Sequence, residues 1–267
     1  MENKKKKKSL LLSSLDLSSS LYLNATTISN DECAKKGDNF IFAGNECIQF
    51  YKSKGDTEDA LNIIVHGTWK EGTNTLARYA PFAENLSLQT DITTVAVALP
   101  GYSDSSTNNF KSLAHEGDGN LSVKKEYVEF LASLVESLKE KFHASKVTYI
   151  GHSAGCTMGA TMTGLNPHLV NNLVCAGGVY NIHEKEQGKD LISMTDVLHS
   201  VNKDMKMVLV YGTADDISKP QITIDFYNLA KEKGFNVKLV EAKDAPHLDL
   251  DMTDASVDAI VEVVEED

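Results

Sequence analysis

Short apolar runs return at intervals along the chain, and segments of mixed polarity separate them. The runs that are short enough for strands cover residues 61–65, 93–99, 147–150, 173–176, 207–211 and 237–241. In the segments between them, apolar residues tend to recur every three or four positions, which is the period of a helix with one buried face. Strands that alternate with helices predict an α/β fold with a mostly parallel β-sheet and helices on both of its faces.

The clearest helical pattern covers residues 122–142, and a second one lies near the C-terminus. The first has one apolar stripe, made by Val128, Leu131, Val135, Leu138 and Phe142. The second should turn four residues inward, namely Val257, Ile260, Val261 and Val264. Both stripes have the spacing of helices that pack on a sheet.

Three segments depart from this alternation. Residues 39–51 predict a hairpin of two short strands that turns at Gly44 and Asn45. Residues 103–120 are rich in Ser, Asn, Gly and Asp, so we expect a long surface loop there. The short stretch between Gly177 and Lys206 leaves room for only a short cap over the sheet.

The composition is that of a soluble globular protein. The chain has 267 residues, of which 42% are apolar and 24% charged, and its formal net charge is −12. This size fits one α/β domain over residues 26–267. The negative charge argues against nucleic acids and anionic membrane surfaces as partners. No run approaches the ~20 apolar residues that would span a bilayer.

Residues 1–25 have a different character. Lysines at positions 4–8 precede a Leu- and Ser-rich stretch that reaches Ala25. This order of basic, apolar and small residues is that of a secretory signal, although Asp16 and several serines interrupt the apolar part. The segment therefore reads either as a signal, which would make the protein secreted or periplasmic, or as the disordered tail of a cytoplasmic protein.

The four cysteines divide into two pairs. Cys33 and Cys47 flank part of the predicted hairpin, and a disulfide between them would suit an exported protein. Cys156 and Cys175 fall in elements that should be buried, where free thiols behave as small apolar groups. No Cys or His cluster has the spacing of a zinc site, so we expect no metal ion and no cofactor.

A serine stands at a strand–helix junction in the middle of the chain. Residues 151–155 read GHSAG, follow the apolar run at 147–150 and open a stretch of small residues. Glycines on both sides leave room for a strained serine backbone where the strand meets the helix. The pattern G-x-S-x-G at such a turn projects the Ser153 hydroxyl clear of the sheet, near the first N–H groups of the helix, that of Ala154 foremost.

Further polar residues follow other predicted strands. Asp215 and Asp216 come after the run at 207–211, and His247 comes after the run at 237–241. The run at 61–65 ends in His66, Gly67, Thr68 and Trp69. A histidine can take the proton of a serine hydroxyl, and a carboxylate can orient that histidine, so these residues supply a nucleophile with its base.

With these landmarks the chain resembles the α/β-hydrolase superfamily, of the serine hydrolase or esterase type, from about residue 39 to the C-terminus. The resemblance implies an α/β-hydrolase fold with Ser153 as the nucleophile, His247 as the base and Asp215 as the acid. It favours Asp215 over Asp216, because the acid of this family typically lies three residues after the glycine that ends the strand. The residues do not identify a subfamily.

The resemblance also implies how the site would work on a substrate. An oxyanion hole would consist of the N–H groups of Ala154 and Thr68, with His66 bracing the turn. The expected reaction is the hydrolysis of a small-molecule carboxylic ester through an acyl-enzyme intermediate. The side chains expected to contact the substrate are Trp69, His152, Tyr180 and Leu248.

Charge near the expected mouth of the site bears on the choice of ester. Asp216, Asp249 and Asp251 follow the predicted strands that carry the acid and the histidine. We expect them to favour neutral or cationic esters over dicarboxylate esters.

Other functions remain open at this point. Acyl transfer, thioester hydrolysis and peptide cleavage use the same triad, because the pocket selects the acceptor and the leaving group. A non-catalytic binding protein of the same fold is another alternative. Such a protein would be expected to lack one of the three triad residues, whereas all three positions are filled here. The glycines at 151, 155 and 159 loosely resemble a dinucleotide-binding fingerprint, but they lie in mid-chain and not in the first strand–helix unit.

Overall fold

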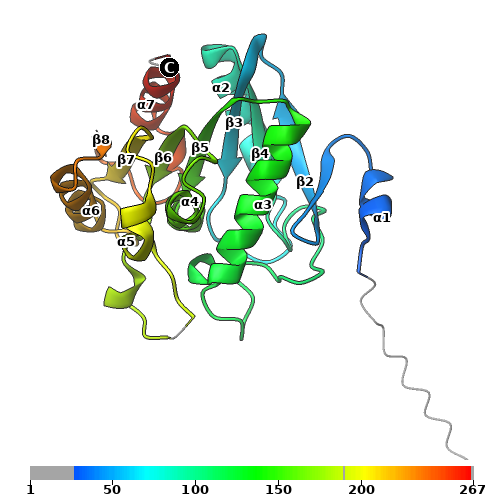
Figure 1. Ribbon diagram of the computed structural model, residues 1–267, viewed down its shortest axis with the longest axis horizontal. Coiled ribbons are helices and arrows are strands. Elements are labelled where there is room, and N and C mark those ends of the chain that lie inside the picture. The colour runs from blue at the N-terminus through cyan, green and yellow to red at the C-terminus, as the bar shows by residue number, and fades with distance from the viewer. Residues whose placement is uncertain (1–26, 189, 266–267) are drawn as a thin grey trace, which may run out of the picture.

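The computed structural model describes residues 27–188 and 190–265, so the expectation of a signal or tail at 1–25 lies outside the described residues. The strands are β1 (Phe40–Ala43), β2 (Glu46–Ser53), β3 (Thr57–Val65), β4 (Ile92–Val97), β5 (Lys146–His152), β6 (Asn172–Ala176), β7 (Lys206–Gly212) and β8 (Asn236–Ala242). They form one sheet in the order β1-β2-β4-β3-β5-β6-β7-β8 (Figure 1). Strand β2 is antiparallel to β1 and β4, and all other neighbours in the sheet are parallel.

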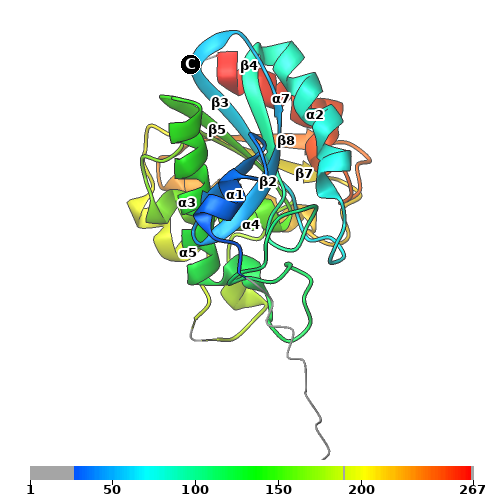
Figure 2. The ribbon, with the colours of Figure 1, turned by 90° about the vertical axis from the view of Figure 1, so that its right-hand side faces the viewer.

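Helices cover both faces of this sheet. They are α1 (Asn30–Ala34), α2 (Thr75–Thr90), α3 (Lys125–Lys141), α4 (Ala154–Leu165), α5 (Met194–Val197), α6 (Pro220–Glu232) and α7 (Asp254–Glu265). Figure 2 shows α2 and α7 on one side of the sheet and α3 and α5 on the other. Helix α4 packs on β5 and β6 beside α3, and α6 packs on β7 and β8. The predicted α/β fold is confirmed, and none of the described helices is long and apolar enough to cross a bilayer.

The apolar pattern located the elements to within a few residues. The hairpin at 39–51 is confirmed, with its turn at Gly44 and Asn45. The predicted helix at 122–142 divides into a 3₁₀ turn, η1 (Leu121–Val123), and α3. In α7 the structure buries Val263 and leaves Val261 and Val264 half-buried. That helix carries more apolar positions than one buried face needs, so the spacing alone could not select among them.

The cap between β6 and β7 is short, as expected. It consists of α5 between two 3₁₀ turns, η2 (Ile182–Glu184) and η3 (Leu198–Ser200), joined by irregular chain. Within the described residues, this segment is therefore too small to form a helical bundle over the carboxyl ends of the strands.

Both cysteine pairs form disulfides. Cys33 of α1 joins Cys47 of β2, with the Cα atoms 5.5 Å apart, so this pairing is confirmed. The expectation of free thiols at Cys156 and Cys175 is wrong, because these two residues are bonded to each other with Cα atoms 4.9 Å apart. Cys156 lies in the first turn of α4, and that turn rests on the end of β6, where Cys175 is located. The sequence shows that both elements are buried but not that they meet at these positions.

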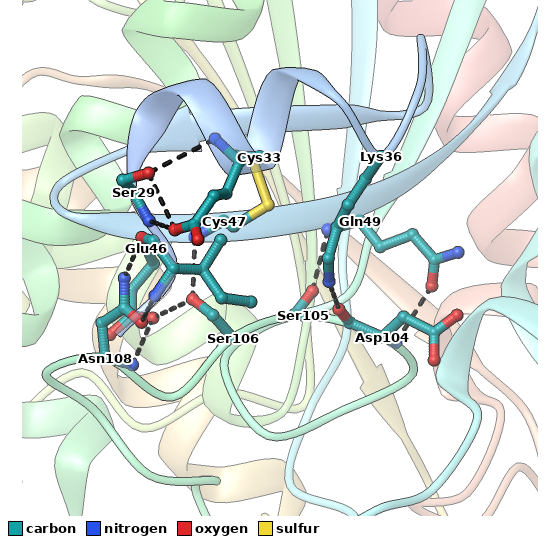
Figure 3. Close-up of a disulfide and its surroundings, with 12 residues drawn as sticks. Ser29, Cys33, Lys36, Glu46, Cys47, Gln49, Asp104, Ser105, Ser106 and Asn108 are labelled. Carbon is teal, nitrogen blue, oxygen red and sulfur yellow. Dashed lines mark hydrogen bonds between the residues drawn. A yellow bond between two sulfur atoms is a disulfide. The ribbon is translucent and has the colours of Figure 1, made fainter. Parts of the chain in front are cut away.

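The segment at 103–120 is an irregular loop, and one buried carboxylate ties it to the hairpin (Figure 3). Glu46 is fully buried. Its two oxygens accept the Ser106 hydroxyl and the backbone N–H groups of Asn108 at 2.8 Å, Asn109 at 2.5 Å and Phe110 at 3.0 Å. Charge-assisted bonds of this kind are stronger than neutral ones. The predicted long surface loop is therefore confirmed, and these bonds anchor it to the body of the protein.

Candidate active site

Ser153 lies at the sharp turn between β5 and α4. Its backbone has φ 53° and ψ −116°, a conformation that costs a non-glycine residue about 1–3 kcal/mol. A Cβ on Gly151 would come within 2.7 Å of the backbone of Cys156, and a Cβ on Gly155 would overlap the carbonyl oxygen of Val65. The two glycines of the GHSAG motif are thus required by close packing of the turn, and the strained serine is held between rigid elements.

The side chains of Ser153, His247 and Asp215 form a continuous line of hydrogen bonds. His247 Nε2 lies 2.8 Å from Ser153 Oγ, and His247 Nδ1 lies 2.8 Å from Asp215 Oδ2. An ionised carboxylate can only accept, so the ring proton is on Nδ1 and the Nε2 lone pair faces the serine hydroxyl. This tautomer is the one that a general base for Ser153 needs.

Asp215 is fixed by its own surroundings. Its side chain is inaccessible to solvent, and its other oxygen, Oδ1, accepts the N–H groups of Ile217 at 2.9 Å and Ser218 at 2.8 Å. Asp216 is exposed to solvent. Of the two neighbouring carboxylates that the sequence offered, the structure brings Asp215 to the histidine.

His66 orients the backbone opposite Ser153. Its Nδ1–H donates to Gly67 O at 2.7 Å, and its Nε2 accepts the N–H of Leu99 at 3.1 Å. Burial lowers the pKa of His66 to about 4, so the ring is neutral and both bonds are kept at neutral pH. The C=O and N–H of one trans peptide point in opposite directions, so holding Gly67 O directs the N–H of Thr68 away from His66.

The same turn lies against the serine. A Cβ on Gly67 would come within 2.7 Å of Ser153 Cβ, so only glycine permits this approach. Ala154 is the first residue of α4, and its N–H has no acceptor within the helix. The turn that precedes Thr68 and the first turn of α4 therefore both lie beside Ser153.

Two of the four residues expected to contact a substrate are at least partly exposed. Leu248 follows the histidine and is 54% exposed. Trp69 is half-buried, and the guanidinium of Arg78 lies 5.0 Å from the centre of its ring. Ile217, after the acid, is 66% exposed and was not singled out from the sequence. An apolar side chain placed after a catalytic position is the signal that could have identified it.

The other two residues are buried. Tyr180 is buried, with its ring stacked on Phe226 at 4.2 Å between centroids. His152 is also buried, and its Nε2 is bonded to the carbonyl oxygen of His247 at 2.8 Å. Tyr180 nevertheless lines a cavity of about 480 Å³ together with Ile217 and Phe226, whereas His152 is held against the backbone of the catalytic histidine.

The acidic mouth expected from the sequence is only partly present. Asp251 is 2% exposed and so cannot face an incoming substrate. Asp249 pairs with Arg78, which offsets its charge. Asp216 remains as an exposed acid. Only one of the three acids is therefore free to repel a dicarboxylate ester, so the structure gives little support to the expected preference against such esters.

Gly177 is a further residue of the site that the sequence analysis did not identify. A Cβ on it would come within 3.2 Å of the His247 ring, and its φ is 63°. The pair Gly177 and Gly178 directly after a buried strand is the signal for such a close approach. Within the described residues, no group of three or more His, Cys, Asp or Glu side chains is arranged to hold a metal ion.

Comparisons with known proteins agree with this fold. Residues 63–200 match the family model described as alpha/beta hydrolase fold. Among solved structures, an esterase from Pyrococcus furiosus is similar with a TM-score of 0.65 and 15% identity, covering 85% of this chain and 90% of that one. A carboxylesterase from Bacillus cereus is similar with a TM-score of 0.56 and 14% identity, covering 82% and 94% of the two chains.

A third similar structure, Est1E from Butyrivibrio proteoclasticus, was solved with ferulic acid bound. Its TM-score is 0.56 at 15% identity, and the match covers 85% of this chain and 96% of that one. Among curated protein sequences, none matches the chain. At these identities the solved structures support the fold and leave the substrate open.

Proposed function

The chain belongs to the α/β-hydrolase fold family, and from this premise we propose that it is a serine hydrolase that cleaves small-molecule carboxylic esters. One observation carries the proposal. Ser153, His247 and Asp215 are joined by two 2.8 Å hydrogen bonds, in the tautomer that activates the serine. A strained backbone at Ser153 further supports a functional role, because such strain concentrates at active sites.

The reaction would proceed in two steps. Ser153 Oγ attacks the ester carbonyl while its proton passes to His247 Nε2, and Asp215 stabilises the imidazolium. The N–H groups of Ala154 and Thr68 would bind the oxyanion, each contributing about 3–4 kcal/mol to transition-state stabilisation. His247 then returns the proton to the leaving alcohol. Water attacks the acyl-enzyme by the same route, and the acid is released with Ser153 restored.

The preference for esters rests on two observations. Similar structures from Pyrococcus furiosus and Bacillus cereus are described as an esterase and a carboxylesterase. Leu248, which directly follows His247, and the half-buried Trp69, two residues after the glycine that contacts Ser153, are apolar, and the cap is short. An open apolar rim of this kind suits small neutral acyl or alcohol groups better than a long peptide.

We also propose that the protein works outside the reducing cytosol. Two disulfides are formed within the described residues, Cys33–Cys47 and Cys156–Cys175. Disulfides persist in oxidising compartments and are rare where thiol reductants are abundant. This supports secretion or a periplasmic location over the cytoplasmic alternative.

Hydrolysis of p-nitrophenyl esters with acyl chains of increasing length tests the proposed function. We expect measurable turnover by the wild type and a loss of about 10⁴-fold or more in kcat for Ser153→Ala. Ser145→Ala, a change at an exposed serine, is the matched control and should retain full activity. Parallel assays with thioester and peptide substrates, and with an added alcohol acceptor, separate ester hydrolysis from the other reactions of the triad. Equal activity of Ser153→Ala and the wild type would contradict the proposal.

A further inference from the structure

A second acid–histidine pair lies buried behind the catalytic histidine. It consists of His152, the last residue of β5, and Asp251, in the 3₁₀ turn η4 (Leu250–Met252) that follows His247. Their side chains are 5% and 2% exposed, and His152 Nδ1 lies 3.9 Å from Asp251 Oδ1. Within the described residues, neither His152 Nδ1 nor either Asp251 carboxylate oxygen has a hydrogen-bond partner. Buried polar atoms without partners are costly, so their juxtaposition calls for an explanation.

The other nitrogen of His152 fixes the protonation of the ring. His152 Nε2 lies 2.8 Å from the backbone oxygen of His247. A carbonyl oxygen can only accept a hydrogen bond, so Nε2 carries a proton. Nδ1 then faces Asp251. If neither His152 Nδ1 nor the Asp251 carboxylate held a proton, the lone pair of the nitrogen would face the negative charge of the carboxylate in the interior of the protein, away from water. One proton between them makes the pair neutral and removes that cost.

The groups around Asp251 favour this arrangement. Burial raises the pKa of Asp251, while the charges of His152, Arg78 and His247 act in the opposite direction. From α2, the Arg78 guanidinium is engaged with Asp249. Burial also raises the pKa of Tyr79, and the charge of Asp251 raises it further, so that phenol stays neutral. The neutral Tyr79 hydroxyl interacts with Asp251 as a donor and keeps its proton, so His152 is the group that can share a proton with Asp251.

We propose that His152, oriented by Asp251, is a positioning residue for the catalytic histidine of the proposed hydrolase. The contact is made to the His247 main chain, so it holds the loop that carries the ring and leaves both ring nitrogens for Ser153 and Asp215. The inference rests on the proposed function for its kinetic effect. A displacement of about 1 Å in a catalytic group can cost on the order of 100-fold in rate.

The kinetic test compares two substitutions of one residue. His152→Phe removes the donor to His247 O, whereas His152→Gln keeps an amide N–H that can reach it. We expect His152→Phe to lower kcat by about 100-fold with KM within about threefold of the wild type, and His152→Gln to recover at least about tenfold of that loss. His168→Gln, at an exposed histidine, is the control. Thermal unfolding verifies that each variant is folded. Wild-type kcat in folded His152→Phe, or equal losses in both variants, would overturn the proposal.

Asp251 offers an independent comparison. Asp251→Asn keeps a neutral group that can donate to His152 Nδ1, whereas Asp251→Leu removes the partner of the ring. We expect Asp251→Asn to stay within about tenfold of wild-type kcat and Asp251→Leu to lose about 100-fold, as His152→Phe does. Equal kcat values for the Asn and Leu variants would contradict the pairing.

A spectroscopic readout separates this inference from the proposed function. The Nδ1–H proton of His247, bonded to Asp215, should give a low-field proton resonance in the wild type and in Ser153→Ala. In the Ser153→Ala background we expect His152→Phe to remove or broaden that resonance and His152→Gln to retain it. No catalysis is needed for this comparison, so it decides the positioning role even if the wild type hydrolyses no ester. An unchanged resonance in His152→Phe would refute it.

Discussion

Acid should destabilise this protein through the fully buried histidine His66. Its ring is fully buried and uses both nitrogens in the neutral form, Nδ1–H to Gly67 O and Nε2 from the Leu99 N–H. A second ring proton would have to be placed on Nε2, against the N–H of Leu99. Burial lowers the pKa of His66 from 6.5 to about 4.

The size and sign of the effect follow from that pKa. A fall from 6.5 to about 4, at about 1.4 kcal/mol per pKa unit, corresponds to about 3 kcal/mol of folding free energy. Because the folded pKa is the lower one, the unfolded chain binds the proton first. The stabilisation is therefore fully present above pH 6.5 and is lost as the pH falls from about 6.5 to about 4.

Urea unfolding at pH 7 and pH 4, followed by circular dichroism, measures this loss. We expect the wild type to lose about 3 kcal/mol more between the two pH values than His66→Gln, which cannot titrate. His168→Gln, at an exposed position, should behave as the wild type. If His66→Gln is too unstable to compare, titration of the His66 ring protons by NMR in the wild type replaces it. Equal pH dependence of the wild type and His66→Gln, or a His66 pKa near 6.5, would refute the reasoning.

Three further predictions concern the turn, the acid and the hairpin disulfide. Gly155→Ala should lower the unfolding free energy by about 1–3 kcal/mol and abolish ester hydrolysis, because the added Cβ overlaps a carbonyl oxygen of β3; melting curves and kcat test this. Asp215→Asn should lower kcat roughly 10⁴-fold by favouring the wrong histidine tautomer, whereas Asp216→Asn should stay near wild-type kcat in the same assay. Replacing Cys33 and Cys47 together by Ser, which removes a bond across 14 residues, should lower the unfolding free energy in urea by about 3 kcal/mol and leave kcat nearly unchanged.

The periodic apolar pattern was sufficient to predict the fold because the central strands, β4 to β7, are buried on both faces. Runs such as 207–211 are apolar throughout, and the polar residues that follow them mark the carboxyl edge of the sheet. The resemblance to α/β hydrolases added the prediction that Ser153, Asp215 and His247, each of which follows a predicted strand, form a triad. Parallel strands place their carboxyl ends side by side, so these positions share one edge of the sheet.

Contacts between elements distant in sequence could not be predicted in this way. The Cys156–Cys175 bond depends on how the first turn of α4 meets β6, and Glu46 gathers a loop some 60 positions further along the chain. Asp251 was expected at the mouth of the site because it follows the predicted strand that leads to His247, yet η4 turns it inward toward His152. Each case depends on packing distances that a pattern of apolar and polar positions does not contain.

Covalent labelling with a fluorophosphonate, followed by peptide mapping, tests the central claim most directly. The probe reacts with serines that are activated by a neighbouring base and leaves ordinary serines unmodified. The account predicts rapid labelling of the wild type at Ser153, no labelling of Ser153→Ala, and slow labelling of His247→Ala. Absence of label on the folded wild-type protein, or label on another serine that persists in Ser153→Ala, would contradict it.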